Sequence, residues 1–315
     1  MIATLRRLLL VSAGAVALSA CGPAQGSGDF SKSLSEAAVA YERADYAEAI
    51  RLYRLAADKG LGTAQYKLGV MYANGRGVAQ DYAEALRWYR LAADQGHAAA
   101  QSNLGTMHRD GEGVPQNYTE ALRWYRLAAD QGREEAQTNL GVMYNRGDGV
   151  PQNYVEAVRW YRLAADKGLA AAQLNLGVMY ENGRGVVQDY AEALRWYRLA
   201  ADQGEANAQS ILGSMYRAGE GVPQNYTEAL RWYRLAADQG DWFGQYFLGS
   251  MYEKGEGVPQ NYVEAYKWWS LAAAQGDVAD AANNRDLVLA KMTPAQIAEG
   301  QRLSAAWKPK PVLPP

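Results

Sequence analysis

The sequence holds few side chains that could carry out chemistry. Its one cysteine is Cys21, and its two histidines are His97 and His108. A single cysteine excludes an intramolecular disulfide, and two histidines are too few for a His-rich metal site. No Ser/His/Asp or Cys/His arrangement is available for nucleophilic catalysis. We therefore expect no catalytic residue, no cofactor and no metal site, and we expect that the protein is not an enzyme.

Glutamates and Gly-x-Gly motifs do recur, but at a fixed interval instead of in one cluster. Each glutamate follows an Asp or Asn as Glu84 follows Asp81, which is the pattern of a capping box at a helix N-terminus. The glutamates that share this pattern are Glu84, Glu120, Glu156, Glu192, Glu228 and Glu264. The Gly-x-Gly motifs follow expected helices and not strands, so they do not indicate a dinucleotide site.

The interval organises most of the chain. The segment Asp189–Gly204 recurs nearly unchanged, with every gap 36 residues long. Its last glycine stands at Gly60, Gly96, Gly132, Gly168, Gly204, Gly240 and Gly276. Such a period predicts a solenoid of stacked two-helix units. Trp88 recurs with the same spacing, which favours a core residue over a platform that stacks on sugars or bases.

The repeated motifs resemble a known family. They read Ala-Gln-x-x-Leu-Gly-x-Met-Tyr, then Gly-x-Gly-Val-Pro-Gln-Asn-Tyr, then Glu-Ala-x-Arg-Trp-Tyr-Arg-Leu-Ala-Ala, and are similar to Sel-one-like repeats (SLR), which are related to tetratricopeptide repeats (TPR). The resemblance implies an all-α, right-handed α/α solenoid that acts as an adaptor for proteins or peptides, without catalysis. Some SLR proteins pair cysteines in every repeat and have been linked to β-lactam binding. This chain has no such cysteines, so the resemblance does not imply that function here.

The period divides the chain into expected segments. Residues 1–20 are a signal peptide, 21–32 a lipidated cysteine and flexible tether, and 33–60 a TPR-like first unit without the Gly-x-Gly loop. The SLR units are expected at 61–96, 97–132, 133–168, 169–204, 205–240 and 241–276. Residues 277–307 form a degenerate unit and a C-terminal cap helix that begins after Thr293, with Gln296 completing a capping box. Residues 308–315 are a Pro-rich tail, expected to be extended.

The N-terminus indicates where the protein is placed. Arg6 and Arg7 precede an apolar run over residues 8–20, which is shorter than the roughly 20 residues that span a bilayer. The sequence Leu-Ser-Ala-Cys that ends at Cys21 resembles a bacterial lipobox, so we expect lipid on Cys21 and a membrane anchor facing the periplasm. Gly22 favours the outer membrane. The alternative is an ordinary signal peptide with a chance cysteine.

The expected partner is a protein or peptide of the cell envelope. The formal net charge is −2, without a basic stripe, which argues against nucleic-acid binding. By resemblance to TPR-like units, the first helices line a concave groove, and the positions there that vary between repeats are candidates for contact with the partner. These candidates are Tyr66, Arg109, Asn145, Arg146, Glu181, Arg217, Tyr246, Glu253 and Lys254.

Two other functions compete with this adaptor. Trp242 and Phe243 break the repeat pattern and could stack on sugar, which would make the protein a binder of peptidoglycan or another cell-wall glycan, or an accessory to an envelope enzyme. The end units could also stack between chains and produce an assembly.

Overall fold

The computed structural model describes residues 27–275 and 279–310, which form sixteen α-helices and no strand. The first helices of the units are α1 (Ser27–Glu42), α3 (Gly62–Asn74), α5 (Ala98–Asp110), α7 (Glu134–Arg146), α9 (Ala170–Asn182), α11 (Ala206–Ala218), α13 (Trp242–Lys254) and α15 (Ala279–Leu289). The second helices are α2 (Tyr46–Ala57), α4 (Tyr82–Asp94), α6 (Tyr118–Asp130), α8 (Tyr154–Ala165), α10 (Tyr190–Asp202), α12 (Tyr226–Gln239) and α14 (Tyr262–Ala273), and the last helix is α16 (Pro294–Ala306). The expected all-helical repeat of helix pairs is confirmed.

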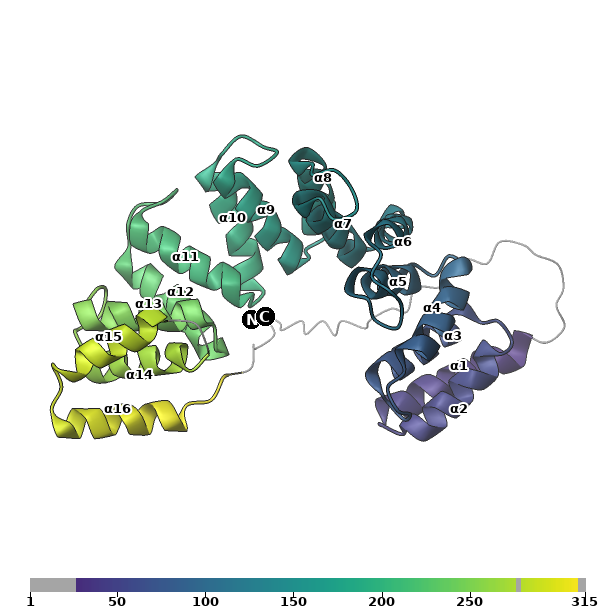
Figure 1. Ribbon diagram of the computed structural model, residues 1–315, viewed down its shortest axis with the longest axis horizontal. Coiled ribbons are helices and arrows are strands. Elements are labelled where there is room, and N and C mark those ends of the chain that lie inside the picture. The colour runs from purple at the N-terminus through teal and green to yellow at the C-terminus, as the bar shows by residue number, and fades with distance from the viewer. Residues whose placement is uncertain (1–26, 276–278, 311–315) are drawn as a thin grey trace, which may run out of the picture.

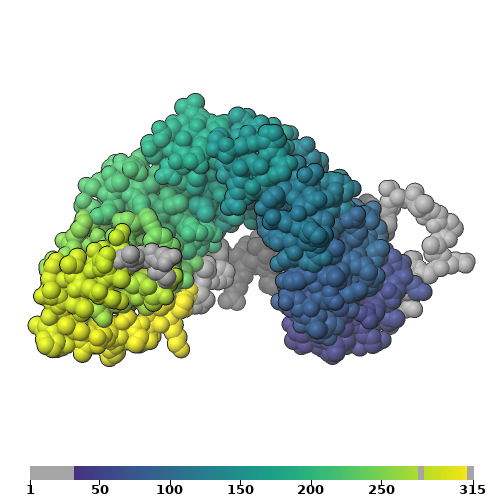
Figure 2. All heavy atoms as spheres, in the orientation of Figure 1, coloured from purple at the N-terminus to yellow at the C-terminus, as the bar shows by residue number. Residues whose placement is uncertain are grey.

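The helix pairs follow one another along an arch, with α1 and α2 at one end and α14 to α16 at the other (Figures 1 and 2). From α1 to α15, each helix packs against its neighbours in sequence, as in a solenoid, and α16 packs against α14. Within the two described ranges, none of the helices is long and apolar enough to cross a membrane.

Local chemistry fixes where each helix begins and ends. The side chain of Asp81 accepts a hydrogen bond from the Glu84 backbone N–H at 3.0 Å, so the expected N-cap is present. The reciprocal half of the capping box is absent here: the Asp81 N–H donates to the Tyr72 carbonyl, and the Glu84 carboxylate instead pairs with Arg87 at 3.1 Å. Gly75 ends α3 with a φ of 64°, a left-handed conformation that favours glycine.

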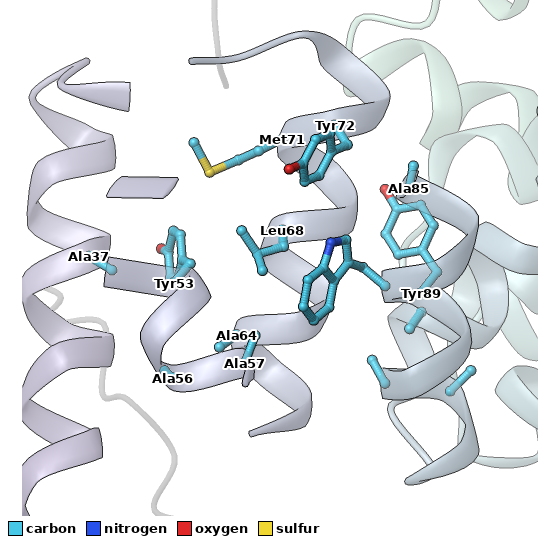
Figure 3. Close-up of a cluster of buried hydrophobic side chains, with 14 of the residues drawn as sticks. Ala37, Tyr53, Ala56, Ala57, Ala64, Leu68, Met71, Tyr72, Ala85 and Tyr89 are labelled. Carbon is cyan, nitrogen blue, oxygen red and sulfur yellow. The ribbon is translucent and has the colours of Figure 1, made fainter. Parts of the chain in front are cut away.

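The core lies between the helices of each pair and between successive pairs. Figure 3 shows part of it, where Leu68 of α3 points toward Tyr53 of α2. Trp88 and Tyr89 are buried, which confirms the interpretation of the recurrent tryptophan as a core residue. A Cβ on Gly69 would lie 2.5 Å from the Tyr89 ring. Glycine therefore lets the two helices approach closely.

A glutamine ladder joins successive units. The buried Gln65 side chain donates to the Ala57 carbonyl of the preceding unit, and its Oε1 accepts a hydrogen bond of 2.7 Å from Gln95. The same arrangement recurs at the later junctions with one exception, where Lys167 replaces the glutamine. There the Gln137 Oε1 atom is buried without a partner in the described chain, and Lys167 bonds the Gly132 carbonyl instead.

The two ends differ from the expected segments. Helix α1 begins at Ser27, so residues 27–32 are helical and not part of a tether. The apolar positions with helical spacing predicted a start at residue 33, and the helix extends further toward the N-terminus. Residues 1–26, with Cys21 and Gly22, lie outside the described residues. At the other end, the expected capping box of Thr293 and Gln296 is present.

Helix α16 packs along α14 (Figure 1). Tyr266 in α14 replaces the Ile, Leu or Val of the earlier units and faces α16, where a Cβ on Gly300 would lie 2.7 Å from its ring. The chain then returns to α12, where the Lys310 N–H donates to the Asp238 carbonyl at 2.7 Å. The first part of the expected tail is therefore held against the solenoid; residues 311–315 lie outside the described residues.

Candidate partner-binding surface

The candidate surface follows the first helices, and it starts from how these helices meet. First helices of successive units contact one another, α5 with α7 and α11 with α13. Neighbouring helices lie closer on the inner side of a curved array than on its outer side. These contacts therefore fit first helices on the inner side of the arch, as the family resemblance implies.

The candidates nearest the N-terminus already have partners within the chain. Tyr66 is half-buried and stacks on His97, with ring centroids 4.6 Å apart. Arg109 pairs with Asp110 at 2.7 Å and donates to the Asn139 side chain of the next first helix at 3.2 Å. These side chains therefore join neighbouring first helices.

Three candidates, Glu181, Asn145 and Arg146, lie in the middle of the array and differ in how they are paired. The Glu181 carboxylate accepts a hydrogen bond of 2.5 Å from the Tyr197 hydroxyl. Burial, together with this bond, raises the pKa of Tyr197. Asn145 is half-buried, and its Oδ1 atom has no partner among the described residues. Arg146 is exposed and forms no salt bridge with any residue in the described ranges.

The structure brings three candidates together near the C-terminal end. Tyr246, Glu253 and Lys254 line one cavity of about 250 Å³ between α13 and α15. Lys291, in the turn that follows α15, pairs with Glu253 at 2.7 Å across this cavity. The Tyr246 hydroxyl accepts a hydrogen bond from Asn284 at 3.2 Å. Lys254 is exposed at the rim.

Arg217 lies in a second cavity, of about 400 Å³, one unit earlier. Its guanidinium pairs with Glu256 of the following unit at 2.9 Å and lies 5.4 Å from the centre of the Phe247 ring. Phe247 and Tyr233 also line this cavity and stack with centroids 5.3 Å apart. Two consecutive residues of α13, Tyr246 and Phe247, therefore each line one of the two cavities.

An aromatic ladder runs along α13 and includes both residues that break the repeat. Phe243 is half-buried and packs against Phe247 at 4.6 Å, whereas Trp242 is 45% exposed. Only Trp242 of this pair thus presents much of its ring to solvent. Sequence reasoning missed Phe247, although the comparison of repeats could have found it: the earlier units have Lys, Asn or Ile at its position.

No arrangement on this surface is suited to catalysis by a metal. Among residues 27–275 and 279–310, no group of three or more His, Cys, Asp or Glu side chains is placed to hold a metal ion. His97 caps α5, with its Nδ1 accepting from the Ala100 N–H, and His108 occupies a buried position where the later units have tyrosine.

The chain matches known proteins over most of its length. The family profile of the Sel1 repeat matches residues 40–61, 62–97, 98–132, 134–169, 170–205, 206–241 and 242–277. The solved structure of a Sel1 repeat protein from Oxalobacter formigenes is 32% identical, covers 76% of this chain and 96% of its own, and superposes with a TM-score of 0.71. The structure of c5321, a protective antigen of uropathogenic Escherichia coli with an SLR fold, is 28% identical. It covers 88% of this chain and 84% of its own, with a TM-score of 0.51. No curated protein sequence matches significantly.

Proposed function

This chain belongs to the Sel1 repeat family, and from that premise we propose that it is a non-catalytic scaffold, anchored by lipid in the bacterial cell envelope, that binds another envelope protein along its first helices. The observation that carries the proposal is the pair of adjacent cavities on α11, α13 and α15, lined by Arg217, Tyr246 and Glu253. Tyr and Arg in partly desolvated hollows are the side chains most enriched at the energetic centres of protein interfaces.

The ion pairs of these cavities suit exchange with a partner. Arg217 with Glu256 and Glu253 with Lys291 are only partly buried, and such pairs contribute little to the stability of the solenoid itself. A partner segment with charges of both signs can therefore replace them at small cost, while its apolar side chains cover Phe247 and Tyr246. We expect the partner to present an extended segment or loop of mixed charge.

Whole-cell cross-linking tests the proposal. The native protein is compared with a variant carrying Arg217→Ala, Tyr246→Ala and Glu253→Ala, and captured proteins are identified by mass spectrometry. A partner of the native protein should be lost in this variant. The matched control carries Arg123→Ala, Arg195→Ala and Glu228→Ala on second helices and should retain it. Equal capture by all three forms would remove the first-helix surface from consideration.

The lipid anchor is tested separately. Cys21 is the expected modified residue, and radiolabelled palmitate supplied to cells should enter the native protein but not the Cys21→Ala variant. The variant should also leave the membrane fraction, because several acyl chains are needed for durable anchoring. Membrane fractionation decides whether Gly22 directs the protein to the outer membrane, as we expect.

Exposure of Trp242 favours one alternative, which is binding to cell-wall glycan. Retention of the protein on purified cell wall in salt, abolished by Trp242→Ala but not by the substitutions in the two cavities, would place this function ahead of the scaffold.

A further inference from the structure

A row of exposed leucines runs along the second helices, away from the cavities described above. These leucines are Leu55, Leu91, Leu127, Leu163, Leu199 and Leu235, each between 40% and 50% exposed. The next leucine in the series, Leu271, is only partly exposed and belongs with Trp307 to the side chains that pack against the last core cluster. The last junction between second helices therefore differs from the earlier ones.

That last junction, between α12 and α14, is filled by the chain itself. The Trp307 ring lies 6.5 Å from the Trp268 ring, and a Cβ on Gly240 would lie 3.6 Å from it. Three residues further on, the Lys310 Nζ atom pairs with the Asp238 carboxylate at 2.8 Å. Trp307 and, three residues later, Lys310 thus occupy a hollow made by Trp268, Gly240 and Asp238.

The preceding junction, between α10 and α12, has the same construction. Trp232, Gly204 and Leu235 stand one repeat before Trp268, Gly240 and Leu271, and Asp202 stands one repeat before Asp238. Trp232, Gly204, Leu235 and Asp202 line a cavity of about 520 Å³, and the Lys310–Asp238 pair forms its border with the next junction. The other lining residues are Ala201, Gln209, Arg231 and Gln239. Asp202 is exposed and pairs with no residue in the described ranges, whereas the equivalent Asp238 is covered by Lys310.

We propose that this hollow, which we name the α10–α12 hollow, binds an aromatic side chain of a partner protein that is followed three residues later by a lysine. The aromatic ring covers Leu235 and Gly204, and the lysine pairs with Asp202. The chemistry of the ligand is read from the segment Trp307–Lys310, which fills the equivalent hollow one unit further on, and from the charge of Asp202. The proposal concerns a surface separate from the first helices, so it does not depend on the proposed function.

The test uses the full chain, purified from membranes in detergent, and a peptide probe. The probe is acetyl-Leu-Ser-Ala-Ala-Trp-Lys-Pro-Lys-amide, which reproduces residues 303–310, with a photoreactive diazirine on the residue before the tryptophan. Labelled residues are mapped by mass spectrometry over a range of probe concentrations. We expect saturable labelling at the α10–α12 hollow, weakened about tenfold by Leu235→Arg and unchanged by the control Leu127→Arg, the same substitution at an equally exposed leucine of α6 that does not line the hollow.

A charge exchange tests the lysine. Replacing the last lysine of the probe by glutamate should weaken labelling of the hollow about fivefold, and Asp202→Lys should restore it for that probe alone. This pattern separates recognition from non-specific contact with an exposed leucine.

Three results would overturn the proposal. One is labelling of the hollow that ignores Leu235→Arg or the charge exchange. Another is labelling only around Trp268, where the probe would merely replace the chain's own segment. The third is labelling that appears only in a variant ending at Lys310, because residues 311–315 would then be the occupant.

Discussion

At the scale of single residues, His108 is the clearest departure from the repeat. Other units have a tyrosine there, whose hydroxyl accepts a hydrogen bond from an arginine of the preceding second helix, as Tyr144 does from Arg126 at 2.7 Å. His108 is buried, and neither ring nitrogen has a partner in the described chain. Burial lowers the pKa of His108. The folded protein therefore disfavours its charged form.

This predicts a dependence of stability on pH. Below about pH 6.5 the unfolded chain binds a proton at His108 more readily than the folded chain, so the free energy of unfolding falls as the pH drops through that value. His108→Tyr should remove this contribution and add a hydrogen bond from Arg90, raising stability by about 1 kcal/mol at pH 7. Urea denaturation of both proteins at pH 7.5 and 5.5 measures the difference. An equal loss on acidification in the variant would contradict the assignment.

A second prediction concerns the break in the glutamine ladder. Lys167→Gln should give the orphaned Gln137 Oε1 the partner that its equivalents have, and raise the free energy of unfolding by about 1 kcal/mol. The control is Lys59→Gln, the same change at the equivalent position of the first unit, where the sequence has Leu34 in place of the partner glutamine. If both variants gain equally, the effect is one of local helix propensity and not of the ladder.

At the scale of helices, the close approach of the two helices of a pair requires glycine where they meet. A Cβ on Gly141 would lie 2.5 Å from the Tyr161 ring. Helix propensity alone predicts that Gly141→Ala gains about 1 kcal/mol, but overpacking should reverse the sign and cost about 1–3 kcal/mol. Thermal unfolding gives the outcome. Gly62→Ala, where the nearest atom lies at 3.4 Å on a flexible glutamine, is the matched control and should cost nothing.

The sequence predicts these helices well because the signals that set them are local. Asp or Asn caps, left-handed glycines and the spacing of Trp88 and Tyr89 each act within one helix or turn. The start of α1 at Ser27 was not predicted, because no cap residue marks it. The bond of the Asp81 N–H to Tyr72 was missed because it replaces the capping-box contact with one to the preceding helix.

The candidate surface was less predictable, for a physical reason. Variation between repeats identified Arg217 and Glu253, but their ion-pair partners, Glu256 and Lys291, stand about one repeat later in the chain. A register of this kind depends on how successive first helices face each other, which no single repeat encodes. The same holds for Trp307, which the sequence placed in a cap helix without indicating the hollow that it fills.

At the scale of the whole molecule, each unit touches only its neighbours, so damage should stay local. A chain that ends at Met292 loses the contacts of Gly300 with Tyr266, of Trp307 with Trp268 and of Lys310 with Asp238. We expect backbone hydrogen exchange to become faster in α13 and α14 while α3 to α6 keep their protection, because opening at one end need not propagate.

Hydrogen exchange measured by mass spectrometry on both forms decides this prediction. The reference is the full chain with Lys310→Ala, which removes one ion pair but leaves α16 on α14, and it should resemble the native protein. If exchange in α3 to α6 accelerates as much as in α14, the array unfolds as one cooperative unit, and the last helix then stabilises the entire arch. Protection confined to the distant units instead means that α16 acts as a cap, closing one end of the core and leaving the other units to rely on their immediate neighbours.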